Sequence, residues 1–160
     1  MQTIPFETHR QWMEVALQEA EAAAAAGEIP VGAVIVDGQG QAIATGQNRR
    51  ERDLDPAGHA ELVAMRAAAQ ILGQWRLSDC TLYVTLEPCP MCAGAILQAR
   101  VGQLVYGADD PKAGAVRTRL NLPESALSFH RLPVLGGILG DRCRHQLQNW
   151  FAAKRRSGHP

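Results

Sequence analysis

Four residues in two short stretches carry the side chains best suited to chemistry. His59 and Glu61 stand two apart in one stretch, and Cys89 and Cys92 stand three apart in the other. Thiolate sulfur and neutral imidazole are the usual ligands of Zn²⁺, and a site with three protein ligands keeps a fourth tetrahedral position open, as catalytic sites do. His59, Cys89 and Cys92 supply that number of ligands. The sequence therefore predicts a bound Zn²⁺ with one open position.

Glu61 adds a group able to act at the open position. Two thiolates and one imidazole cancel the charge of the ion, so the bound water is acidified less than it would be by three histidines. A nearby base should then help to remove its proton, and Glu61 is placed to be that base.

A closed structural zinc site is the alternative interpretation of these residues. Its fourth ligand would be Cys80 or Cys143, because C-x-x-C pairs are also common in structural zinc ribbons. Structural sites usually present their ligands as two paired knuckles, however, and neither cysteine has a partner at ligand spacing. The closed site would also leave Glu61 without a role. The joint pattern therefore favours catalytic zinc.

The elements that must position these residues follow an α/β pattern. Apolar residues at helical spacing predict a first helix over residues 8–26, with Thr8 as its cap. Two runs rich in β-branched or alternating residues, 31–36 and 41–46, flank a turn cluster and predict a β-hairpin.

Each reactive stretch opens a helix. A polar loop delivers the chain to His59, at or just before the first turn of a helix that ends near residue 72. A buried strand over 80–85 precedes a helix over 90–99, whose first turn brings Cys89 and Cys92 to one side. Unpaired N–H groups and the dipole favour thiolate there. Both helix N-termini are expected at one end of the sheet, the usual place for a site in an open α/β fold.

The remaining segments complete the predicted sheet. A strand over 103–106 follows the second of these helices, and strand, helix, strand indicates a parallel crossover. Residues 107–128 are loop-like. A last strand over 132–135 is restricted to an edge by Pro133, and a final helix runs over 138–156.

Composition narrows the class of protein. The chain has 160 residues, 46% hydrophobic and 20% charged, which fits one globular domain over residues 1–160. Sixteen Lys and Arg balance sixteen Asp and Glu, so any nucleic-acid surface must be a local patch. We find no secretory leader or membrane-spanning run and expect a cytoplasmic protein with no membrane partner, in which Cys80 and Cys143 are reduced thiols.

The other histidines and the aromatic residues are expected to be structural. His9 and His145 are predicted on helix surfaces, His130 in ordinary packing, and His159 in a frayed terminus. Core positions are expected for most of the larger aromatic residues: Trp12, Trp75, Tyr83, Trp150 and Phe151.

The zinc pattern, H-x-E followed by P-C-x-x-C, resembles that of the cytidine deaminase-like superfamily. Further stretches narrow the resemblance to the bacterial tRNA-specific adenosine deaminase family and cover nearly the whole chain: Glu28–Val34, Gly46–Arg49, Asp55–Glu61, Leu82–Cys89, Met91–Ala95 and Gly136–Leu139. The resemblance implies a three-layer α/β/α fold with a central mixed five-stranded sheet, a homodimer and one Zn²⁺ per subunit. It also implies hydrolytic deamination of adenosine to inosine at the wobble position of a tRNA anticodon.

The same match implies roles for single residues. Glu61 would be the proton shuttle, Asn48 would hydrogen-bond the target nucleoside, and Val31 and the Ala60 backbone would line the base pocket. The anticodon stem-loop would meet RNA-contact candidates that lie in one loop and at the end of the last helix: Asp110, Lys112, Lys154 and Arg155. By residue type alone, the last two simply form a favourable helix C-terminus.

Two departures from the family pattern affect the expected RNA contacts. Asp109 stands where relatives often have an arginine, and Arg50 stands where a proline is common. Two rival functions stay open from the residues. One is deamination of a free nucleobase or nucleoside, such as guanine or cytosine, and the other is a catalytically silent zinc module that serves as an interaction subunit.

Overall fold

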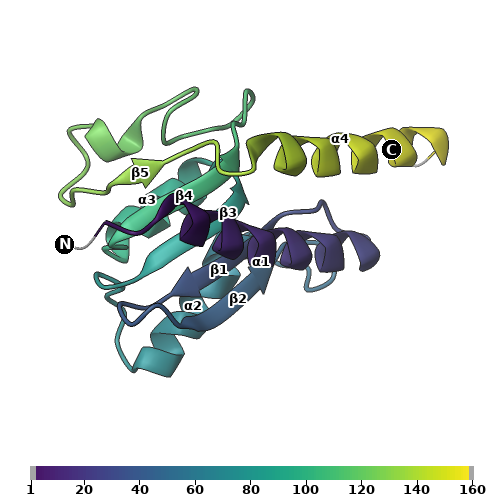
Figure 1. Cartoon of the computed structure of the whole chain (residues 1–160). Coiled ribbons are helices and arrows are strands. Elements are labelled where there is room, and N and C mark those ends of the chain that lie inside the picture. Colours follow the sequence, from purple (N-terminus) through teal and green to yellow (C-terminus); the bar gives the residue numbers. More distant parts are fainter. Residues whose placement is uncertain (1–2, 159–160) are drawn as a thin grey trace.

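The computed structural model describes residues 3–158 and contains one mixed sheet of five strands with helices on both faces (Figure 1). The strands are β1 (Gly32–Val36), β2 (Ala42–Gln47), β3 (Thr81–Leu86), β4 (Gln103–Ala108) and β5 (Val134–Leu135). The helices are α1 (Phe6–Ala25), α2 (Ala60–Leu72), α3 (Pro90–Gln98) and α4 (Gly140–Arg156), with a short 3₁₀ helix, η1 (Leu122–Glu124).

The strand order is β2-β1-β3-β4-β5. β1 is antiparallel to both β2 and β3, and β4 is parallel to both β3 and β5. The predicted hairpin is confirmed, and its turn is closed by the Asp37 carboxylate, which accepts the backbone N–H groups of Gln39 and Gln41 at 2.9 Å each. The parallel pairing of β3 with β4 and the edge position of β5 are also confirmed.

Two hydrophobic cores, one on each face of the sheet, lie between the sheet and its helices. α1 and α4 cover one face, and α2 and α3 cover the other (Figure 1). Two glycines allow a helix to approach the sheet closely. A Cβ at Gly32 would lie 2.1 Å from the Ala16 carbonyl oxygen of α1, and one at Gly46 would lie 2.2 Å from the Ala60 carbonyl oxygen of α2. The absence of a side chain at Gly46 therefore lets α2, the helix that follows His59, lie close to the sheet.

The start of α1 differs from the prediction. The helix begins at Phe6, with Pro5 before it and no side-chain cap, so Thr8 lies inside the first turn and is not the cap. The prediction that His9 is a surface residue is also wrong, because His9 lies on the helix stripe that faces the sheet and is 5% exposed. Its Nδ1 pairs with the hydroxyl of buried Tyr83 at 3.0 Å.

α4 buries less than the sequence predicts. Among its residues only Cys143 is buried, while Trp150 is half-buried and Phe151 is exposed. The helix extends beyond the edge of the sheet, which explains this exposure (Figure 1). Trp75 is also exposed, so of the aromatic residues expected in the core only Tyr83 is fully buried.

The remaining histidines behave as expected where the structure describes them. His145 is exposed on α4, and the ring Nε2 of His130 lies 2.7 Å from the Val101 carbonyl oxygen. His159 lies outside the described residues. No helix within residues 3–158 has the length and apolar character needed to cross a membrane.

Candidate metal centre

The N-termini of α2 and α3 meet at one end of the sheet, as predicted. Because β1 runs antiparallel to both β2 and β3, the C-terminal ends of β2 and β3 lie at the same end of the sheet. The chain leaves β2 through a loop that ends at His59, the residue before α2, and leaves β3 through a short segment that ends at Cys89, the residue before α3. Pro90 begins α3, where a missing N–H costs nothing.

The three predicted metal ligands converge. Nδ1 of His59 lies 3.6 Å from Sγ of Cys89 and 3.4 Å from Sγ of Cys92, and the three ligand atoms all lie within 4.8 Å of one another. A tetrahedral Zn²⁺ with ordinary Zn–S and Zn–N bonds requires an N-to-S edge of about 3.6 Å. The donor set and its spacing therefore fit a zinc ion.

The two thiols share one hydrogen bond. The hydrogen bond with Cys92 is the main cause that lowers the pKa of Cys89 to about 4, with further help from His59. The same hydrogen bond, followed by burial, raises the pKa of Cys92. His59 has a raised pKa, chiefly through its hydrogen bond with Cys89. Cys89 is therefore the thiolate of the group, and Zn²⁺ would bind it together with neutral His59 and deprotonated Cys92.

Glu61 lies beside these ligands in the first turn of α2 and is 4% exposed. Burial raises the pKa of its carboxyl group to about 7, and the side chain lies next to the Cys92 thiol. A carboxyl group with a pKa near the working pH can both accept and release a proton, which suits general acid–base catalysis.

The alternative of a closed structural site is wrong. Cys80 and Cys143 are buried free thiols, and neither belongs to the ligand group formed by His59, Cys89 and Cys92. That group is the only cluster of three or more potential metal ligands found within residues 3–158. Burial raises the pKa of both outlying thiols, which fits inert core cysteines.

The predicted substrate residues Asn48 and Val31 are hydrogen-bonded to each other, and Ala60 directly follows the metal ligand His59. Asn48 is 7% exposed, its backbone N–H donates to the Val31 carbonyl at 3.1 Å, and its side-chain amide donates to the Ile29 carbonyl at 3.3 Å. The next residue, Arg49, donates its N–H to the Gly58 carbonyl at 2.8 Å, directly before His59. Ala60 is buried behind His59 in the first turn of α2.

The predicted RNA-contact residues fall in two places. The Asp110 carboxylate accepts the backbone N–H groups of Lys112 at 2.9 Å and of Ala113 at 3.2 Å, so it shapes its own turn, while Lys112 is exposed. Lys154 and Arg155 lie in the last turn of α4, where the Lys154 ammonium stands 5.2 Å from the centre of the Trp150 ring. The structure does not bring these two groups together into one site.

The two departures from the family pattern have different surroundings. The Asp109 carboxylate accepts a hydrogen bond from the Tyr106 hydroxyl at 2.9 Å, and this bond holds the Asp109 side chain in place. The charge of Arg50 acts on His59 and opposes the rise in its pKa.

Sequence reasoning missed two buried carboxylates that organise the loops beside the metal centre. Glu28 accepts the N–H groups of Arg52 at 2.7 Å and Glu51 at 3.3 Å, and Arg52 in turn donates to the Asn48 carbonyl at 3.1 Å. Glu87 collects donors from the loop after β4. In the sequence, each glutamate stands next to an apolar stretch that forms a strand, with no charged residue directly before or after it. A lone acidic residue at such a position is the signal that could have found them.

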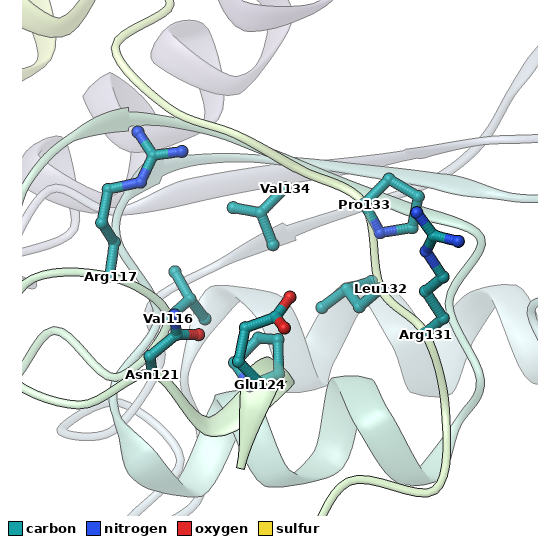
Figure 2. Close-up of a pocket in the computed structure, with 9 residues that line it drawn as sticks. Val116, Arg117, Asn121, Glu124, Arg131, Leu132, Pro133 and Val134 are labelled. Atoms are coloured by element: carbon teal, nitrogen blue, oxygen red, sulfur yellow. The ribbon is translucent and has the colours of Figure 1, made fainter.

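One surface hollow lies apart from the metal ligands. It measures about 290 Å³, and Figure 2 shows Arg117 and Arg131 on opposite sides with the Glu124 carboxylate between them. None of the metal ligands lines it. An acidic group at its centre opposes a phosphate, so we assign it no role in the chemistry.

Several known proteins that are similar to this chain are deaminases. A family model described as MafB19-like deaminase matches residues 7–142. A tRNA-specific adenosine deaminase from Haemophilus influenzae is 44% identical over 149 residues, which cover 93% of this chain and 86% of that protein. The chain belongs to the tRNA-specific adenosine deaminase family. The resemblance predicted from the sequence is thereby confirmed.

Solved structures agree with this family. One solved structure matches with a TM-score of 0.83 at 42% identity, and the match covers 86% of this chain and 99% of the chain in that structure. It comes from work on A-to-I editing by tRNA:A34 deaminases at the wobble position of transfer RNA. A guanine deaminase from Nitrosomonas europaea matches with a TM-score of 0.76 at 27% identity, covering 89% and 84%. The predicted α/β fold with a mixed five-stranded sheet is confirmed, and the adenosine deaminase family shares more sequence with this chain than the guanine deaminase does.

Proposed function

We propose that this chain catalyses the zinc-dependent hydrolytic deamination of adenosine to inosine at the wobble position of a tRNA anticodon. The observation that carries the proposal is the convergence of His59, Cys89 and Cys92 beside buried Glu61, in a chain of the tRNA-specific adenosine deaminase family. The reaction consumes one water and releases one ammonia.

The three ligands would hold one Zn²⁺ per subunit. When bound, the ion acts as a Lewis acid that makes water a better nucleophile near neutral pH. Glu61 takes a proton from the attacking water as the water oxygen adds to C6 of a flipped-out adenine, and delivers a proton to the ring nitrogen. Glu61 then passes the proton of the added hydroxyl to the exocyclic amino group, the bond between C6 and that amino group breaks, and ammonia leaves as C6 becomes a carbonyl carbon.

The pocket residues orient the nucleoside. Asn48 would hydrogen-bond it with the side-chain amide, whose present contacts to Ile29 and Arg50 are both 3.3 Å and so easily exchanged. Val31 and the Ala60 backbone would line the base pocket. Asp110 and Lys112 would contact the anticodon loop near the site, and Lys154 and Arg155 would contact the RNA further away.

The decisive assay measures ammonia release from an anticodon stem-loop RNA with adenosine at the wobble position. A matched stem-loop with inosine there should release none, and free guanine and cytosine should be deaminated far more slowly. Faster release from a free base would replace this proposal with the nucleobase deaminase. Failure on every substrate by fully zinc-loaded protein would support the silent zinc module.

Glu61→Ala tests the proton shuttle within the same assay. Loss of general acid–base catalysis should lower kcat by about 10²–10⁴-fold while zinc content stays at the wild-type level. A variant with near-normal turnover would contradict the role given to Glu61.

We further propose that the protein is a homodimer, as the family resemblance implies, and that it is cytoplasmic, as expected from its sequence. The bound metal should appear at one zinc per chain in elemental analysis, and the mass from light scattering should be twice the chain mass of 17.3 kDa. A monomer that is fully active on the stem-loop would refute the dimer without affecting the proposed chemistry.

A further inference from the structure

A single buried carboxylate gathers the loop that follows β4. Glu87, one residue beyond β3, is 1% exposed. Its Oε1 accepts backbone N–H groups of Thr118 at 2.8 Å, Arg117 at 2.9 Å and Val116 at 3.4 Å. Its Oε2 accepts the N–H of Asp110 at 3.0 Å and the hydroxyl of Thr118. Both ends of one loop therefore bond to the same side chain.

Backbone dipoles balance the charge of this carboxylate. None of the ion pairs found within residues 3–158 includes Glu87. Converging N–H groups form a concave anion site in place of a cation. Burial by itself would raise the pKa of Glu87, but hydrogen bonds from Thr118, Asp110 and Arg117 bring it below its ordinary value. The group is therefore ionised at neutral pH.

The loop closes tightly around the carboxylate. A Cβ on Gly114 would lie 2.3 Å from Oε2 of Glu87, so only glycine fits at that point of the loop. The Ala115 N–H donates to the Pro88 carbonyl at 2.9 Å, and the Glu87 N–H donates to the Ala108 carbonyl at 2.8 Å. The loop over 110–118 is thus bonded on both sides to the segment that leads directly into Cys89.

We propose that Glu87 is a positioning residue for the RNA substrate. Its carboxylate fixes the loop over 110–118, and with it Asp110 and Lys112, at a set place relative to the metal ligands. The role rests on the proposed function, because it assigns that loop to RNA. Glu87 itself touches neither the substrate nor the metal.

Glu87→Gln separates this role from catalysis. A glutamine side chain keeps one acceptor oxygen, but its NH₂ group faces backbone N–H donors, so at least one of these donors loses its partner. We expect the KM for the wobble-adenosine stem-loop to rise about tenfold or more, with kcat changed by less than about threefold. Zinc content should stay at the wild-type level, and amide hydrogen exchange over residues 110–118 should become faster.

Two milder variants guard against a folding defect in Glu87→Gln. Thr118→Val removes only the hydroxyl donor and should also raise the KM. Thr118→Ser keeps the hydroxyl, so its KM should equal that of the wild type. Glu124→Gln is the matched control, because this exposed carboxylate lies in the following segment and makes no such bonds. It should behave as wild type.

Several results would overturn the inference. A fall in kcat at unchanged KM, or a loss of zinc, would make Glu87 a support of the metal centre. Unchanged KM in both Glu87→Gln and Thr118→Val would show that the RNA does not need the loop held in place. These outcomes leave the proposed function intact, whereas wild-type protein that is inactive on the stem-loop would refute both together.

Discussion

Removing the hydroxyl of Tyr83 should destabilise the protein without affecting its metal centre. The Tyr83 hydroxyl and Nδ1 of His9 lie 3.0 Å apart, between α1 and β3, and both side chains are buried. The substitution Tyr83→Phe keeps the ring in the core and deletes one oxygen. It leaves a buried imidazole nitrogen without the partner it has in the wild type.

The size of the effect follows from the burial of the pair. A buried polar group left without its hydrogen-bond partner costs about 1–3 kcal/mol. In a domain of this length, each kcal/mol shifts the melting temperature by about 2–4 °C. Tyr83→Phe should therefore lower the free energy of unfolding by about 1–3 kcal/mol and the melting temperature by about 2–12 °C. Replacing both partners, with His9→Leu added, should recover part of the loss because no polar group then stays unpaired.

Urea unfolding at pH 8, followed by circular dichroism, measures the cost, and zinc content and turnover serve as controls. Zinc content and turnover should both match the wild type, because the pair lies between α1 and the sheet, while the metal ligands lie at the N-termini of α2 and α3 on the other face. Equal stability of Tyr83→Phe and wild type would refute the reasoning. A double variant less stable than Tyr83→Phe would show that packing, and not the unpaired nitrogen, dominates.

Three further predictions concern pH, packing and metal. Burial lowers the pKa of His9 in the folded protein, so the unfolded chain binds more protons than the folded protein once the pH falls below about 6.5, and the free energy of unfolding decreases from there. In urea titrations, the difference in the free energy of unfolding between the wild type and His9→Asn should shrink by up to about 1.4 kcal/mol for each pH unit. Gly46→Ala would place a Cβ 2.2 Å from a backbone oxygen of α2, so calorimetry should show a loss of about 1–3 kcal/mol, whereas Gly94→Ala, with open space around it, should not. Cys89→Ala should lose zinc by elemental analysis, and Cys80→Ala should keep it; the reverse would refute the ligand assignment.

The sequence predicts the candidate site well because its geometry is local. His59 and Cys89 each stand directly before a helix, and a helix start fixes where the next few side chains point. Cys92 then follows Cys89 by three residues and must lie on the same side. Only the meeting of the two helices needs long-range structure, and the strand directions supply it.

The parts that the sequence does not predict depend on contacts distant along the chain. His9 becomes buried because α1 begins earlier than its polar residues suggest and because Tyr83, 74 positions later, offers a hydroxyl. No pattern within α1 contains that partner. Glu28 and Glu87 were missed for the same reason, since their bonds go to loops 23 to 31 residues away.

Two glutamates show how the fold gives one side chain opposite properties. Glu61 and Glu87 are almost equally buried, and burial is the largest influence on the pKa of each. Glu87 receives five donors, which outweigh burial and keep it charged. Glu61 lacks such a set, so its pKa rises to about 7 and its proton can be exchanged at neutral pH. The number of donors that the backbone provides, and not the depth of burial, therefore separates a carboxylate fit to anchor a loop from one fit to transfer a proton.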